Sequence, residues 1–276
     1  MELLLGGKMK TLAILVLLGY SFQSQSFTLN NNVGARFAQN EIAINVSANS
    51  ASTCATVGLG TADILDLAQE AANRFWNTVS TSRIKLVKGT EVSVSSNFET
   101  GKLCESVING DICEGAATDI PKVNSGIVIA CNTNTAYEGV LGVSLPNNIN
   151  GNSIVGSAIL IYTGSGETFS SKNRDEKISI IAHEIGHALG LGHSPSEHAL
   201  MYWRSMANKF YLARDDVKGL TYLYPKKDKF LGISSCGTIS FNQPPGGGGL
   251  KLSLLSFLVG LILFASFPIR RSKSLK

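Results

Sequence analysis

The apolar positions of this chain repeat with a period that changes from two to about 3.6 along the sequence. Residues 41–46 alternate apolar and polar side chains, which is typical of a half-buried strand. Apolar side chains then recur three and four positions apart between Ile64 and Val79, which predicts a helix with one face on a core. Thr61 or Asp63 could cap that helix at its N-terminus.

The same patterns predict more strands and a second helix. Short apolar runs predict strands over residues 82–87, 126–130, 139–145 and 157–162, and residues 91–95 could extend the sheet. The second helix has an apolar face and could begin at Asn173 or Asp175. That face is formed by Ile178, Ile181, Ala182, Ile185 and Ala188.

Residues 97–121 are polar and interrupt the strand pattern, so we expect an inserted surface loop. The segment carries Cys104 and Cys113 together with several carboxylates. The acidic residues are Glu99, Glu105, Asp111, Glu114 and Asp119. They could supply Ca²⁺ ligands, but they lack a recognisable calcium-loop spacing. A solvated loop closed by a disulfide is the favoured interpretation.

The N-terminal residues have the pattern of a secretory signal. Met9 and Lys10 precede a short apolar core over residues 11–19, which is too short to span a membrane. Small side chains predict cleavage after Ser26, so residues 1–26 form the expected signal peptide. Residues 27–40 are short, polar and too few for a folded pro-domain. We therefore expect an exported protein.

The C-terminal residues predict a membrane-associated tail. Residues 226–249 form a stalk that ends in a glycine-rich spacer, and residues 250–269 are almost entirely apolar and long enough to span a bilayer. Residues 270–276 are basic, which predicts that they lie in the cytoplasm and the rest outside. Two interpretations stay open: a retained single-pass anchor, or a sorting signal that is removed before release to the cell surface or the extracellular space.

Composition adds few constraints. The chain has 276 residues and a net charge of +4, and much of that charge lies in the tail, so it gives no case for nucleic acid. Five cysteines in an exported chain suggest disulfides. Cys54, Cys104, Cys113 and Cys131 allow three pairings, of which 104–113 with 54–131 is one. Cys236 is left over in the stalk, as a processing or lipidation site, an intermolecular bridge or a free thiol.

An eleven-residue segment that begins at His183 carries the chemistry, with the pattern H-E-x-x-H-x-x-G-x-x-H. On a helix, His183 and His187 lie one turn apart on one face, where two imidazoles can bind one Zn²⁺ at about 2.0–2.1 Å. Glu184 can act as general base on water in the fourth position. Gly190 permits a sharp turn with positive φ, which brings His193 to the metal from outside the helix.

Three neutral ligands and one open position describe a catalytic zinc site rather than a closed structural one. A single histidine is usually a structural residue, but three of the four histidines of this chain fall in this segment. A purely structural interpretation would have to explain the fixed spacing of all of them.

The segment resembles the metzincin metalloproteases and, within them, the matrixins. Met201 lies where that clan places a methionine turn beneath the zinc. Ser194 after the third histidine also matches matrixins, and residues 215–224 look like their last helix. The resemblance extends from about residue 41 to 225, which we take as one metalloprotease domain.

The resemblance implies an α+β fold of the zincin type. It implies a twisted, mostly parallel five-stranded sheet with an antiparallel edge strand and three main helices, to which this chain adds the C-terminal transmembrane helix. The edge strand, at Val140, Leu141, Gly142 and Val143, would bind an extended polypeptide substrate. Matrixins often hold a second, structural zinc through further histidines, but only His198 remains here, so one catalytic zinc is expected. We expect a monomer.

Two other functions stay open at this point. The domain could be a surface binding module that has kept a zinc fold without useful catalysis. Alternatively, the C-terminal tail could be the functionally most important part, with the protein acting as an anchored envelope factor. This function is compatible with proteolysis.

Overall fold

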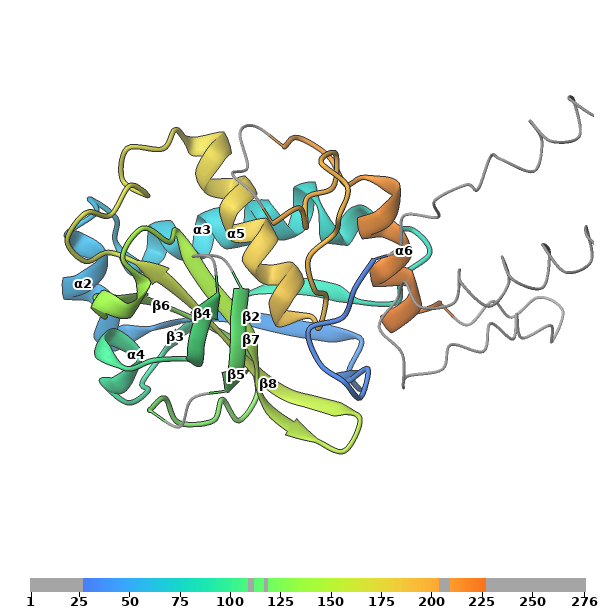
Figure 1. The fold of residues 1–276 in the computed structure, drawn as a ribbon, viewed down its shortest axis with the longest axis horizontal. Helices are drawn as coiled ribbons and strands as arrows, with labels where there is room; N and C mark the ends of the chain where they lie inside the picture. Colours follow the sequence, from blue (N-terminus) through green and yellow to red (C-terminus); the bar gives the residue numbers. More distant parts are fainter. Residues whose placement is uncertain (1–26, 109–111, 117–118, 204–208, 227–276) are drawn as a thin grey trace, which may run out of the picture.

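The computed structural model describes residues 27–108, 112–116, 119–203 and 209–226 (Figure 1). The predicted signal peptide, most of the stalk, the apolar run at 250–269 and the basic tail lie outside these residues and stay predictions. Within the described residues, no helix is long and apolar enough to cross a membrane.

The described residues form eight strands and five α-helices. The strands are β1 (Arg36–Phe37), β2 (Glu41–Ser47), β3 (Lys85–Val92), β4 (Cys104–Ile108), β5 (Ile112–Ala116), β6 (Gly126–Asn132), β7 (Gly142–Asn150) and β8 (Ser153–Tyr162). The helices are α2 (Ala51–Ala55), α3 (Thr61–Arg74), α4 (Asn97–Thr100), α5 (Arg174–Ala188) and α6 (Arg214–Leu223).

The main sheet is mixed and mostly parallel. Strands β3, β2, β6 and β8 are parallel neighbours in that order, and β7 pairs antiparallel with β8. Helices α3 and α5 lie on one face of the sheet (Figure 1). The side chains of β6 alternate between two cores: Ile127 and Ile129 pack with the two helices, and Val128 packs in a second cluster on the other face.

The N-terminal segment adds one strand to the predicted five. β1 pairs with the first two residues of β8, so the sheet has six strands, and the prediction of five was wrong in this respect. Two residues are too few to show a period of two, and the pairing lies more than a hundred positions away in sequence, so the pattern contained no signal for β1. The three longest helices, α3, α5 and α6, agree with the prediction of three main helices.

The segment over residues 97–121 contains more structure than the expected loop. It holds the short helix α4 and an antiparallel hairpin of β4 with β5. Two of its side chains, Phe98 and Leu103, are buried and form part of the second core cluster with Val128. Apolar side chains that are isolated in a polar stretch still find a core when the chain folds back onto the sheet, which periodicity does not reveal.

A disulfide joins Cys54 of α2 to Cys131 of β6, which confirms one of the pairings left open by the sequence. Cys104 is also disulfide-bonded. In the hairpin Cys104 lies opposite Ala116, and Cys113 lies opposite Val107. This register separates the two cysteine backbones by three positions, and the 104–113 pairing stays a prediction.

Removing the Cys54–Cys131 bond is expected to destabilise the domain by roughly 4 kcal/mol. The bond closes a loop with a sequence separation of 77, and cross-links over such loops restrict the unfolded chain by about that amount. Denaturant unfolding of the double variant Cys54→Ser, Cys131→Ala against wild type measures the change. A loss below about 1 kcal/mol would contradict a stabilising role.

Candidate metal centre

Helix α5 carries the first two histidines, and its two ends are closed by local interactions. Asn173 is the N-cap: its side chain accepts a hydrogen bond from Glu176 N, and the Glu176 carboxylate accepts one from Asn173 N in return. At the other end Gly190 has φ +105°, which favours glycine. Because the helix stops there, the chain turns and brings His193 back toward His187, as the sequence predicted.

The N-terminal segment holds this turn in place. Thr28 Oγ1 donates to His193 O at 2.5 Å, and Gly192 N donates to Thr28 O at 2.8 Å. Asn30 Nδ2 donates to His187 O at 2.6 Å. The segment over residues 27–40, predicted to precede the domain, therefore contacts the backbone of two of the three predicted ligands.

The three histidines of the motif converge. One ring nitrogen from each of His183, His187 and His193 lies within 4.8 Å of the others. The Nε2 atoms of His187 and His193 are 3.2 Å apart. Among the described residues this is the cluster of side chains that could hold a metal ion, and it is formed by the three residues that the sequence analysis named.

The hydrogen bonds of the first two rings suit a metal ligand. His183 Nδ1 lies 2.7 Å from Leu200 O, and His187 Nδ1 lies 2.8 Å from Leu191 O. A carbonyl oxygen can only accept, so each Nδ1 carries the proton and each Nε2 keeps its lone pair. Zn²⁺ needs such lone pairs, and the donor set of three imidazoles fits it.

Burial keeps the three rings neutral near pH 7. It lowers the pKa of His183 to about 4 and that of His193 to about 3. It also lowers the pKa of His187 well below its ordinary value, an effect to which the neighbouring His183 and His193 add. Neutral imidazole is the form that binds a metal, so the site is prepared for one without first losing protons.

Met201 lies beneath the helix, in a turn of the chain that follows His193. Ser194 N donates to Met201 O at 2.6 Å, and Tyr202 N donates to Ala199 O at 3.3 Å. The sulfur packs so closely on Gly186 of α5 that an added Cβ there would lie 2.3 Å from it. The same turn supplies the Leu200 carbonyl that orients His183. The assignment of this segment as the methionine turn stays a prediction, and these contacts agree with it.

Asp216 of α6 holds this turn, and the sequence analysis did not single it out. Its Oδ2 accepts hydrogen bonds from Leu200 N and Ala213 N at 2.8 Å, and its Oδ1 accepts one from Met201 N at 3.0 Å. Burial raises the pKa of this carboxyl group. The three N–H donors act in the opposite direction, because they favour the ionised form, but burial has the larger effect. These contacts span up to 16 positions and have no signature in a short window of sequence.

Replacing Asp216 by asparagine is expected to destabilise the domain by about 2–3 kcal/mol. An amide offers one oxygen and one NH₂, so at least one buried N–H donor loses its acceptor. Thermal unfolding of the zinc-saturated protein measures the loss. Asp66→Asn is the control, because its exposed carboxylate pairs with Lys88 and such pairs contribute about 0–1 kcal/mol. Equal stability of the two variants would contradict the assigned role.

Glu184 lies on α5 beside the edge strand β7. Its side chain is 6% exposed, and Ser144 Oγ donates to it at 2.7 Å. Of the four predicted substrate-binding residues, Gly142 and Val143 lie in β7, and Val140 and Leu141 immediately precede it. Strand β7 pairs only with β8 among the described strands, which agrees with an edge position.

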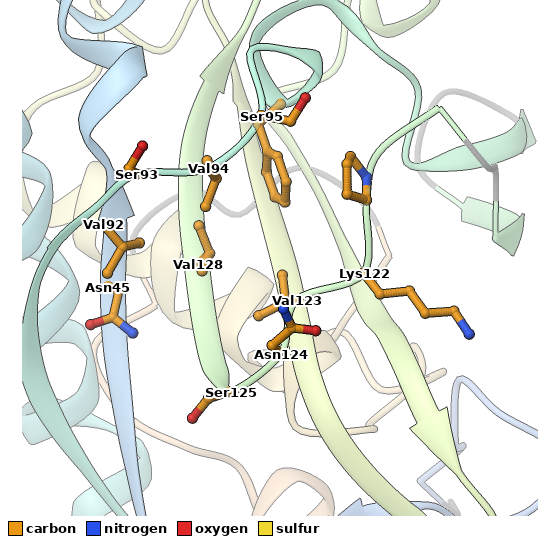
Figure 2. Close-up of a pocket in the computed structure, with 12 residues that line it drawn as sticks. Asn45, Val92, Ser93, Val94, Ser95, Lys122, Val123, Asn124, Ser125 and Val128 are labelled. Atoms are coloured by element: carbon orange, nitrogen blue, oxygen red, sulfur yellow. The ribbon is translucent and has the colours of Figure 1, made fainter.

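A separate cavity of about 370 Å³ lies on the face of the sheet away from α3 and α5 (Figure 2). Its wall is mostly apolar and includes Val94, Phe98 and Val128, with Asn45 at one side and Lys122 at the rim. None of the three histidines, nor Glu184, lines it. The cavity therefore has no part in the candidate metal centre.

Two histidines on one helix, and a third brought back to them by a glycine turn, form a cluster that could hold a metal ion. Comparison with known protein families identifies the family of this chain. The model of the matrixin peptidase family matches residues 67–225, which is more than half of the chain. The chain belongs to the matrixin family, a class of metalloendopeptidases, and the resemblance found in the sequence is confirmed.

Similar proteins carry metalloproteinase names. The chain is 37% identical over 100 residues to metalloendoproteinase 2-MMP of Arabidopsis thaliana, an alignment that covers 31% of this chain and 26% of that protein. It is 47% identical over 94 residues to stromelysin-1 of Rattus norvegicus, which covers 31% of this chain and 20% of that protein. It is 47% identical over 57 residues to human matrix metalloproteinase-20, an alignment that covers 20% of this chain and 12% of that protein. The chain thus spans about a quarter or less of these relatives' own length.

Proposed function

We propose that the chain is a zinc-dependent endopeptidase that hydrolyses peptide bonds in polypeptide substrates. The convergence of His183, His187 and His193, with Glu184 directly after His183 on α5, carries this proposal. The three imidazoles would hold one Zn²⁺ and leave a position for water or substrate. Among the described residues no other group of side chains forms a candidate metal cluster, so we propose zinc alone.

The chain's own residues have separate tasks. Zinc held by the three histidines would supply a Lewis acid for water and for the scissile carbonyl. Glu184 accepts the proton as water attacks the carbonyl carbon, and passes it to the nitrogen of the departing amine. The hydrogen bonds at Nδ1 of His183 and His187 keep both rings oriented through these steps.

Strand β7 would bind the substrate. An extended peptide can add to an exposed sheet edge through main-chain hydrogen bonds, with side-chain pockets selecting the sequence. Gly142 of β7 faces Glu184, and Val143 follows it in the strand, so a peptide paired there would pass close to the base. The proposed substrate class is therefore a locally extended polypeptide.

Casein cleavage by the purified chain tests the activity. We expect cleavage that stops with a zinc chelator and returns when Zn²⁺ is added back. The alternative, a binding module without catalysis, requires zinc binding with no cleavage of casein or gelatin under the same conditions.

We also propose that the protein is exported and held at the membrane, or released after its tail is removed. The apolar segments near residues 11–19 and 250–269 and the basic residues 270–276 support this. N-terminal sequencing and intact-mass measurement of the mature protein test it. A mature protein that begins at Phe27 and keeps its tail indicates an anchor, one shortened at the tail indicates sorting, and an uncleaved N-terminus contradicts export by this signal.

A further inference from the structure

Ser144 is a buried serine of β7 whose hydroxyl contacts the candidate base on the neighbouring helix. Its side chain is 4% exposed. Its Oγ lies 2.7 Å from Glu184 Oε2 and also 2.7 Å from the Glu184 backbone oxygen. The two residues are 40 positions apart in sequence, so only the packing of β7 on α5 brings them together.

The Ser144 hydroxyl lies within hydrogen-bond distance of two acceptors. Because a serine has a single O–H, it donates to one of the two Glu184 oxygens at a time. Donation to a carboxylate is charge-assisted and stronger, so the bond to Oε2 is the preferred one while Glu184 is ionised. Once the base carries the proton of the attacking water, the serine can accept from the carboxyl and donate to the backbone oxygen instead. The hydroxyl therefore has a partner at each stage of the proton transfer.

Gly142 bounds the same carboxyl group from another direction. Residues 142 and 144 lie on one face of β7, because side chains alternate along a strand. An added Cβ at Gly142 would lie 3.1 Å from Glu184 Cγ and 3.3 Å from Oε1. The strand thus presents a hydroxyl to Oε2 and a bare backbone beside Oε1, which restricts where the carboxylate can lie.

We propose that Ser144 is the positioning residue of the general base: its hydroxyl holds Oε2 of Glu184 and so sets the direction of the other carboxylate oxygen. This inference rests on the proposed function of Glu184. A glutamate side chain has three rotatable bonds, and holding it in one arrangement before the substrate arrives removes an ordering cost from the reaction step. The role is one of orientation, because Ser144 acts through Glu184 and not on the substrate.

Kinetics of the full chain with zinc bound test this role. In Ser144→Ala, kcat for a fluorogenic peptide taken from a casein cleavage site is expected to fall roughly 10- to 100-fold, the range for loss of a hydrogen bond to a charged group. KM should change by less than about 2-fold, because the buried Ser144 hydroxyl contacts Glu184 and does not lie at the strand edge where the substrate would pair. Zinc content should stay at one per chain. Ser144→Thr, which keeps the hydroxyl, should restore kcat to within about 5-fold of wild type.

Ser157→Ala is the matched control. Ser157 lies on β8, is fully buried, and donates its hydroxyl to Ala188 O of the same helix at 2.7 Å, but it does not contact Glu184. A serine that only anchors strand to helix would give the same result at both positions. We expect Ser157→Ala to lower the thermal midpoint about as much as Ser144→Ala does, while its kcat stays within about 2-fold of wild type.

A direct structural measurement accompanies the kinetics. High-resolution crystal structures of the zinc-bound proteins should show one arrangement of the Glu184 side chain in wild type and several in Ser144→Ala. An unchanged kcat in Ser144→Ala, an equal loss in Ser157→Ala, or one ordered Glu184 in both structures would overturn the proposal. Failure of the proposed function is a different result: wild type itself would then lack cleavage that a chelator stops.

Discussion

Replacing Glu184 by glutamine is expected to remove nearly all peptide cleavage and to leave the zinc in place. The amide has the shape of the carboxyl group and keeps an oxygen that can accept the Ser144 hydrogen bond, but it cannot take up the proton of the attacking water. General acid–base catalysis contributes about 10²- to 10⁴-fold, so kcat should fall by a factor in that range. Metal analysis and peptide hydrolysis on the same preparation measure both quantities.

Glu197→Gln is the control for this experiment. Glu197 is exposed and lies four positions after the third histidine, so its substitution removes the same charge near the site without touching α5. Its rate should match that of wild type. If Glu184→Gln also cleaves at the wild-type rate, Glu184 is not the base.

Replacing His187 by alanine is expected to have the second large effect, the loss of the bound metal. The His187 ring is buried, its centroid lies 4.7 Å from that of His183 and 4.6 Å from that of His193, and its Nε2 atom is 3.2 Å from that of His193. Changes in residues that only orient ligands cost about 10- to 100-fold in metal affinity, so loss of a ligand should cost more than 100-fold. Cleavage should then vanish, because without the metal no water is activated.

Stability provides an independent measure of the same loss. A metal that binds only the folded chain stabilises it by about 4 kcal/mol at a concentration 1,000 times its dissociation constant. Wild type should therefore show a thermal midpoint that falls when a chelator is added, and His187→Ala a midpoint that does not respond. The exposed fourth histidine is the control, since it lies outside the cluster, and His198→Ala should behave as wild type does. A chelator response retained in His187→Ala would contradict the assigned ligand set.

The metal centre could be predicted to a large extent because its information is local. His183 and His187 share a helix face through a spacing of four, and the turn at Gly190, three positions before His193, brings the chain back toward them. The structure brings together the three residues named from this pattern. Their carbonyl partners were not predicted, because Leu200 lies in a turn whose path depends on α6.

The limits of the sequence interpretation have one physical origin, which is contact between distant segments. The strand β1 and the hairpin at 104–116 were missed because each depends on pairing or burial that a short window does not contain. The pairing of Cys54 with Cys131 was one of three choices until the packing of α2 on β6 brought the two residues together.

The amino-acid sequence alone was enough to predict the class of chemistry, the three histidines that converge and a candidate base, because helical spacing and a glycine turn are properties of neighbouring residues. Only the tertiary structure decided how those groups are held. Thr28 reaches the His193 carbonyl across 165 positions, Asp216 holds the Met201 turn from α6, and Ser144 reaches Glu184 from β7. Such hydrogen bonds exist only once the sheet and helices have packed, so no local pattern can encode them.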